Sequence, residues 1–125
     1  MQTSGEPSTE TRGRVFLVED EVMIRMLLED MLADLGYGVA ASAGGLEEAI
    51  ALARSTDFDV AILDVNLNGS SVYPVADVLA ERGVPFVFST GYGERGLSEA
   101  YRDRPTLQKP FQLEILDQAL ATLSR

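Results

Sequence analysis

Five side chains that could bind a metal ion and a phosphoryl group stand directly after short apolar stretches of this sequence. Carboxylates are the ligands that a hard cation such as Mg²⁺ prefers. A hydroxyl and an ammonium group can hold the oxygens of a phosphoryl group. Such chemistry requires a fold that brings the five residues to one place. They are Glu19, Asp20, Asp64, Thr90 and Lys109.

The stretch around Asp64 is the most informative. Residues 60–63 are four apolar residues in a row, and a polar loop containing Gly69 follows the acid at once. So short a continuous apolar run is typical of a strand buried on both faces of a parallel sheet. Asp64 would then lie at the carboxyl end of its strand, where open α/β sheets bind ligands. An acid buried there needs a positive partner.

Predicted strands and helices alternate along the whole chain, which indicates a doubly wound α/β fold with helices on both faces of five parallel strands. Ser71 is the predicted N-cap of the third helix, and Pro74 fits its first turn. The predicted strands are residues 15–18, 37–43, 58–64, 85–89 and about 106–108; the predicted helices are residues 21–35, 46–54, the stretch between Ser71 and Gly83, and residues 113–123.

Residues 94–104 fit this alternation poorly. They contain Gly96, they stop before Pro105, and they carry few apolar side chains. We therefore expect a fourth helix that is short or irregular. Because little apolar burial would oppose local opening, residues 91–105 are also the predicted moving part, and together with the fifth strand and the last helix they are the expected docking surface for a partner.

A sheet of strand order 2-1-3-4-5 would gather the five polar residues at one edge. The first and third strands are then neighbours, and a crevice opens between their carboxyl ends. Glu19, Asp20 and Asp64 would meet in that crevice. Three carboxylates so close cannot all stay ionised without a cation, and an incomplete cage of oxygen ligands suits Mg²⁺ with retained waters. The fourth and fifth strands would add Thr90 and Lys109.

Each residue also has an ordinary structural explanation. Glu19 and Asp20 could favour the dipole of the helix that follows them. Asp64 and Thr90 could be turn residues, and Lys109 alone could be a solvated surface lysine. The predicted gathering of all five at the carboxyl ends of strands favours a phosphoryl-binding site over these explanations.

Composition narrows the range of functions. The chain has 125 residues, a formal charge of −10, no cysteine and no histidine. Disulfides, thiolate metal sites and imidazole catalysis are therefore excluded, and the acidity argues against nucleic acid or an anionic membrane as a partner. Without an apolar span or a signal peptide, we expect a cytoplasmic protein. Residues 1–13 are predicted to be a disordered tail and residues 14–125 a single domain with no output domain.

The same motifs carry a family resemblance over nearly the whole chain, from Arg14 to Arg125. The acidic triplet at residues 19–21, the sequence Leu-Asp-Val-Asn at residues 63–66, Thr90-Gly91, and Lys-Pro-Phe at residues 109–111 resemble the receiver domain of two-component response regulators. The resemblance implies a flavodoxin-like receiver fold.

The resemblance also implies roles. Asp64 would be the phosphoacceptor, and it would bind Mg²⁺ together with Asp20, the backbone carbonyl of Asn66 and, through water, Glu19. Thr90 and Lys109 would hold phosphoryl oxygens, Gly91 would leave the site open to the donor, and the Lys109–Pro110 peptide bond would be cis.

Residues 85–93 are similar to the signature of the FATGUY group of mostly stand-alone receivers. Three departures stand out. Ser89 occupies the position of the alanine in that signature, Glu19 replaces the aspartate more usual in receivers, and Thr106 occupies the position of the aromatic switch residue of many receivers. Tyr92 and Tyr101 are the nearest substitutes for that switch, although an ordinary role as surface aromatics is open for both.

These features predict a single-domain response regulator rather than an enzyme on small substrates. A sensor histidine kinase or a histidine phosphotransfer protein would phosphorylate Asp64, and a downstream protein would bind the phosphorylated form. A degenerate receiver that docks without phosphorylation is one alternative. An aspartyl-phosphate phosphohydrolase is another, but such enzymes place a second acid where this chain has Asn66, and they carry a cap domain.

Overall fold

The protein is described by a computed structural model that covers residues 12–91, 97, 99–101 and 103–123. Its central sheet is parallel throughout and has the strand order β3-β2-β4-β7-β8. This is the predicted order 2-1-3-4-5, and it confirms the doubly wound class. The strands are β2 (Arg14–Val18), β3 (Gly38–Ala43), β4 (Val60–Asp64), β7 (Phe86–Thr90) and β8 (Thr106–Gln108).

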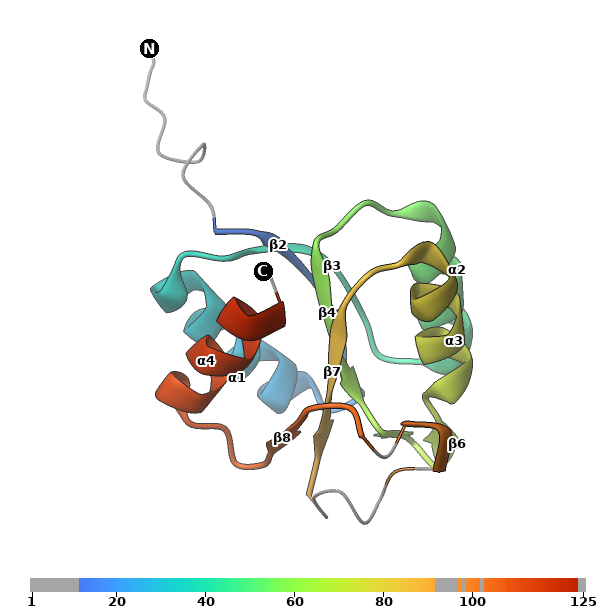
Figure 1. The fold of residues 1–125 in the computed structure, drawn as a ribbon. Helices are drawn as coiled ribbons and strands as arrows, with labels where there is room; N and C mark the ends of the chain where they lie inside the picture. The colour runs from blue at the N-terminus through green and yellow to red at the C-terminus, as the bar shows by residue number, and fades with distance from the viewer. Residues whose placement is uncertain (1–11, 92–96, 98, 102, 124–125) are drawn as a thin grey trace.

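Helices cover both faces of the sheet (Figure 1). α1 and α4 lie on one side, and α2 and α3 lie on the other. Both α1 and α3 end at glycines in the left-handed conformation, Gly36 and Gly83, which a residue with a Cβ adopts at a cost. The helices are α1 (Val22–Leu35), α2 (Leu46–Ser55), α3 (Tyr73–Arg82) and α4 (Leu113–Leu123).

Alternate strand residues pack into two separate hydrophobic cores, one on each face of the sheet. Val60 and Ile62 of β4 pack on the α1 and α4 side, whereas Ala61 and Leu63 pack on the α2 and α3 side. Because successive side chains of a strand point to opposite faces, a strand buried on both sides must be apolar throughout. This explains the continuous apolar run that precedes Asp64.

The chain between β4 and α3 differs from the prediction. α3 begins at Tyr73, and Ser71 is not its N-cap, although the Ser71 hydroxyl accepts a hydrogen bond from the Tyr73 N–H. Ser71 belongs instead to a small antiparallel hairpin of β5 (Asn66–Leu67) and β6 (Ser70–Ser71). Its two turn residues, Asn68 and Gly69, have φ angles of 52° and 87°, as in tight two-residue hairpins.

Two other segments are described in part. Of residues 94–104, the described part contains the three-residue 3₁₀ helix η3 (Glu99–Tyr101), in keeping with the expected short or irregular helix. Residues 1–11 of the expected tail lie outside the described residues. Arg12, also assigned to that tail, is instead anchored: its N–H donates to the Gly36 carbonyl, and its guanidinium pairs with Asp117.

Within the described residues, no helix combines the length and the apolar character needed to cross a membrane.

Candidate functional site

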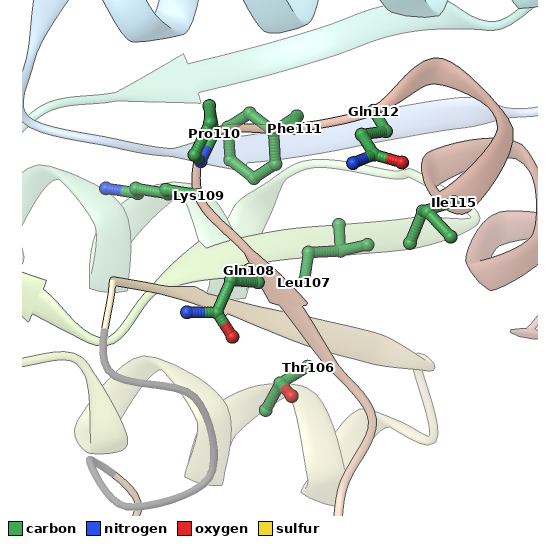
Figure 2. Close-up of a pocket in the computed structure, with 8 residues that line it drawn as sticks. All are labelled: Thr106, Leu107, Gln108, Lys109, Pro110, Phe111, Gln112 and Ile115. Atoms are coloured by element: carbon green, nitrogen blue, oxygen red, sulfur yellow. The ribbon is translucent and has the colours of Figure 1, made fainter.

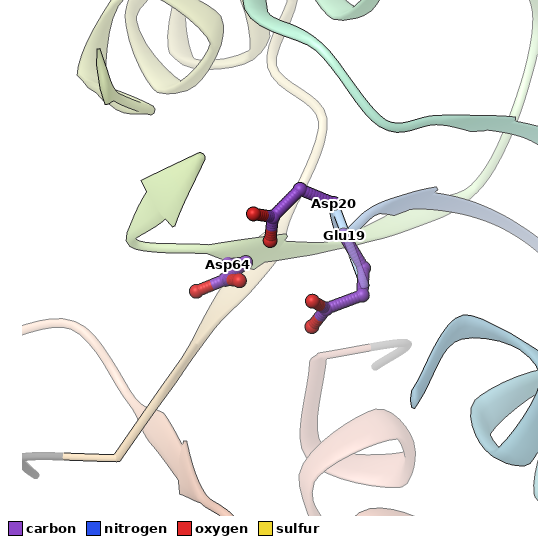
Figure 3. A group of neighbouring side chains, drawn as sticks. All are labelled: Glu19, Asp20 and Asp64. Atoms are coloured by element: carbon purple, nitrogen blue, oxygen red, sulfur yellow. The ribbon is translucent and has the colours of Figure 1, made fainter. Parts of the chain in front are cut away.

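Three carboxylates meet where β2 and β4 end (Figure 3). One carboxylate oxygen from each of Glu19, Asp20 and Asp64 lies within 4.8 Å of the others. Because β2 and β4 are paired in register, with Val18 beside Leu63, the residues that follow these two positions must be neighbours. The strand pairing alone therefore brings the acids together.

Lys109 reaches this group from β8. Its ammonium nitrogen lies 3.1 Å from Oε1 of Glu19 and 3.2 Å from Oδ2 of Asp64. The alternation that places Ile62 and Leu107 on the α1 and α4 side of the sheet continues to Asp64 and Lys109. Both residues therefore face the same side, which allows the ion pair to form across β7.

Backbone N–H groups hold each carboxylate in place. Glu19 accepts a hydrogen bond from the Glu21 N–H at 3.0 Å, and Asp64 accepts one from the Asn66 N–H at 3.2 Å. Asp20 accepts one from the Asn68 N–H of the β5–β6 turn at 3.1 Å. The Asn68 contact could not be predicted, because the β5–β6 hairpin that makes it was not predicted.

The residues present fit a cation. Glu19 and Asp64 are only 1% and 6% exposed, so their charges are poorly hydrated. Oε1 of Glu19 has the Lys109 ammonium as its partner, 3.1 Å away. An all-oxygen set of three acids, two of them buried, beside a single ammonium suits a hard cation such as Mg²⁺.

Burial shifts the proton affinities of the acids. It raises the pKa of Glu19 to about 7, an effect that the Glu21 N–H opposes and the charge of Asp64 reinforces. Burial also raises the pKa of Asp64, against the opposing charge of Lys109. For Lys109, burial acts to lower the pKa, but the hydrogen bond to Glu19 and the charges of both acids outweigh it and raise the pKa.

These shifts predict how metal-free stability depends on pH. Between about pH 4.5 and about pH 7, folded Glu19 keeps a proton that the unfolded chain releases, so its contribution to the free energy of unfolding falls as the pH rises. We expect urea unfolding in EDTA to show the free energy of unfolding of wild type, measured relative to that of Glu19→Gln, falling across this window. A relative free energy that stays constant or rises with pH would contradict the burial of an ionisable Glu19.

Thr90 and Gly91 lie at the same edge. Thr90 is the buried last residue of β7, one position beyond Ser89, the register partner of Asp64. Gly91 is exposed, and a Cβ built on it would meet nothing within 4 Å. Asn66 is exposed beside Asp64, and its side chain accepts a hydrogen bond from the Gly69 N–H. The Lys109–Pro110 peptide bond is cis.

Of the two tyrosines proposed as switch residues, the structure describes only Tyr101. Tyr92 lies outside the described residues. Tyr101 is half-buried and packs against Tyr73 and Phe88, with ring centroids 5.5 Å away in each case, and its hydroxyl donates to Asp77 of α3. Burial and then Asp77 raise the pKa of Tyr101 to about 12. Tyr101 therefore joins η3 to β7 and α3.

A groove of about 430 Å³ runs beside β8 (Figure 2). Thr106, Gln108 and Ile115 are among the residues that line it. Thr106 occupies the position at which many receivers carry an aromatic switch residue. Lys109 also borders the groove, but its side chain points away from Gln112 and Ile115. The groove therefore adjoins the acidic site without being part of it.

Comparison with known proteins gives a consistent picture. The family described as response regulator receiver domain matches residues 15–121. The transcriptional regulatory protein PdtaR of Mycobacterium tuberculosis is 34% identical over 111 residues, which cover 86% of this chain and 54% of that protein. The chain thus spans about half the length of the curated relative that it matches.

Solved structures agree with the sequence matches. The solution structure of SdrG from Sphingomonas melonis Fr1 is 42% identical, has a TM-score of 0.79, and covers 88% of this chain and 94% of SdrG. The crystal structure of the response regulator PhyR from Brucella abortus is 30% identical, has a TM-score of 0.77, and covers 89% of this chain and 47% of PhyR. These neighbours are consistent with the FATGUY-like group.

Proposed function

This chain belongs to the response regulator receiver domain family, and we propose on that premise that it takes up a phosphoryl group on Asp64. The observation that carries the proposal is the position of Asp64: a carboxylate only 6% exposed at the end of a buried strand, 3.2 Å from the Lys109 ammonium and beside two further acids. An acid with no other task would be expensive to keep in such a place.

In the proposed step, an oxygen of the Asp64 carboxylate attacks the phosphorus of a phosphohistidine on a partner protein. The phosphorus–nitrogen bond breaks, its electron pair returns to the imidazole, and an acyl phosphate forms on Asp64. Lys109 offsets the charge on the phosphoryl oxygens, and Thr90 offers them a hydroxyl. Such transfers depend mainly on positioning and on electrostatic stabilisation.

Receiver domains bind Mg²⁺ in an acidic pocket, and the acids of this chain support such a site. Asp20, Asp64 and the backbone carbonyl of Asn66 would hold the ion, and Glu19 would hold it through a water molecule. When bound, Mg²⁺ would neutralise charge that develops on the phosphoryl oxygens. The residues themselves fix the geometry, because each carboxylate already accepts a hydrogen bond from a backbone N–H.

An apolar patch on α1 supports a protein as the phosphoryl donor. Val22, Met23, Met26 and Leu27 are 46–84% exposed, with Met23 the most exposed. The patch begins two residues after Asp20, so a partner that covered it would lie next to Asp64. Exposed apolar patches of this kind commonly mark protein interaction sites.

Met23→Glu should therefore slow phosphoryl transfer from a phosphohistidine protein by about tenfold, the effect of a loss of ~1.4 kcal/mol of binding. Uptake from phosphoramidate, which needs no docking surface, should not change. Val39→Glu, on the edge strand β3 and also exposed, at 39% against 84% for Met23, is the control. Equal slowing with both donors would place the defect in the site and not in docking.

For the downstream partner, we propose the surface of β8, α4 and η3; residues 92–96, 98 and 102 of the predicted docking stretch 91–105 lie outside the described residues. The groove beside β8 supports this choice, as does Tyr101, which links η3 to the strand that carries Thr90. A phosphoryl group that drew Thr90 toward Asp64 would act on the aromatic side chains packed along the same strand. Such a local change in charge and packing is a common basis for a wider switch.

Incubation with phosphoramidate, followed by measurement of the intact mass, tests the proposed function. We expect a gain of one phosphoryl group that requires Mg²⁺ and is prevented by EDTA. No gain under any condition would favour a receiver that docks without phosphorylation. Continuous release of phosphate from small phosphate esters would favour a phosphohydrolase; the position of Asn66, two residues after Asp64, offers no acid for that reaction.

A further inference from the structure

Arg25 occupies a position that helix stability does not explain. It lies in the opening turn of α1 (Val22–Leu35), where the helix dipole disfavours positive charge. Within the described part of the chain, Arg25 forms no ion pair that would compensate. Its guanidinium instead donates a hydrogen bond to the backbone carbonyl of Glu19, 3.2 Å away.

That hydrogen bond completes the fixation of the Glu19 backbone. The Glu19 N–H donates to the carbonyl of Ala43, the last residue of β3, at 3.0 Å. The Glu19 carbonyl accepts from Arg25. Both backbone groups of Glu19 are therefore held, its N–H by the end of β3 and its carbonyl by the start of α1. The orientation of the backbone at Glu19 decides where the carboxylates of Glu19 and Asp20 point.

Gly44 leaves the space in which the Arg25 guanidinium lies. A Cβ on Gly44 would come within 3.0 Å of Nη1 of Arg25, 3.6 Å of the Glu19 carbonyl oxygen and 3.9 Å of the Asp20 Cα. The nearest of these atoms is the far end of a flexible side chain. An alanine at position 44 would therefore move the guanidinium and leave the backbone in place. The neighbouring Gly45 has nothing within 4 Å of such a Cβ.

We infer that Arg25 is a positioning residue for the metal ligands: by holding the Glu19 carbonyl in the space left by Gly44, it sets the carboxylates of Glu19 and Asp20 for cation binding. The inference rests on the Mg²⁺ site of the proposed function. Residues that orient metal ligands through hydrogen bonds commonly affect metal affinity although they do not touch the ion.

Two simpler explanations predict different results. If Arg25 acted only through its charge, its removal would tighten Mg²⁺ binding, because one positive charge near the cation would be lost. If Arg25 only stabilised the fold, its removal would lower the melting temperature in EDTA and leave the Mg²⁺ dissociation constant unchanged. Of the three explanations, only a positioning role predicts that Arg25→Ala binds Mg²⁺ more weakly although a positive charge is lost.

The experiment is a titration of the full chain with MgCl₂. Mg²⁺ binding is measured by NMR from the amide chemical shifts of the β2–α1 and β4–β5 connections. We expect Arg25→Ala to raise the Mg²⁺ dissociation constant on the order of tenfold, with Arg25→Lys in between. Gly44→Ala should raise it as well, and in the Arg25→Ala background it should have no further effect. Gly45→Ala is the matched control, and Asp20→Ala, which removes a ligand, sets the scale of a full loss.

The outcomes separate this inference from the function on which it rests. If wild type binds no Mg²⁺, the proposed metal site fails. If wild type binds Mg²⁺ but Arg25→Ala binds it equally well or more tightly, the positioning role is overturned and the metal site stands. Equal effects of Gly44→Ala and Gly45→Ala would overturn the role assigned to the space at Gly44.

Discussion

The Asp64→Asn variant is expected to take up no phosphoryl group from phosphoramidate at any Mg²⁺ concentration. An amide oxygen is a far weaker nucleophile than a carboxylate oxygen, and none of the remaining acids of the site takes the place of Asp64 at the end of β4 (Val60–Asp64). Intact mass after incubation with the donor measures the effect. Labelling of Asp64→Asn at the rate of wild type would remove Asp64 as the acceptor.

The same substitution should stabilise the metal-free protein, by an amount that grows as the pH rises. Burial raises the pKa of Asp64, so ionisation of Asp64 lowers the free energy of unfolding. The neutral amide introduced by Asp64→Asn avoids this loss. Lys109 keeps its ion pair with Glu19, 3.1 Å away. Thermal unfolding in EDTA should therefore show a higher melting temperature for Asp64→Asn than for wild type at pH 8, with a smaller difference at pH 5.

Lys109→Ala should produce the largest loss of stability in the site. Its ammonium is the cation that faces both Glu19 and Asp64, and its side chain is 20% exposed. Removing one partner of a buried ion pair typically costs about 3–5 kcal/mol. Because Lys109 is partly solvated, we expect roughly 2–3 kcal/mol at pH 8 without metal.

The pH dependence distinguishes this effect from a loss of packing. At pH 5 Glu19 is protonated in the folded state, since its pKa is raised to about 7, so less unpaired charge remains and the cost of Lys109→Ala should shrink. Arg54→Ala, which removes an exposed cation near the end of α2 (Leu46–Ser55), is the control and should change stability by only about 0.5 kcal/mol. A cost of Lys109→Ala that is the same at both pH values would argue against an electrostatic role.

The parallel sheet could be predicted because it depends on features that repeat along the sequence, whereas the strand order 2-1-3-4-5 was adopted as one of the common doubly wound orders. Apolar runs that are buried on both faces, separated by amphipathic helices, specify parallel strands with crossovers. β4 is buried at all five positions, and the four that precede Asp64 are apolar. Once the order was known, the meeting of Glu19, Asp20 and Asp64 followed from the pairing of β2 with β4.

The contacts that the prediction missed are made by single side chains or by very short elements. The β5–β6 hairpin has two residues in each strand, too few for an alternating pattern to be visible. Tyr101 meets Asp77 and Tyr73 across 24 and 28 positions of the chain. Gly44 resembles any loop glycine in the sequence, and only the fold shows that the Arg25 guanidinium lies beside it.

The most direct test of the account is to locate the phosphoryl group on the chain. Wild-type protein is incubated with phosphoramidate and Mg²⁺, the acyl phosphate is reduced with borohydride, which converts a phosphorylated aspartate to homoserine, and the peptides are mapped by mass spectrometry. We predict homoserine at position 64 and at no other aspartate. Homoserine at Asp20 or elsewhere, or none at position 64 in protein that has gained a phosphoryl group, would contradict the account.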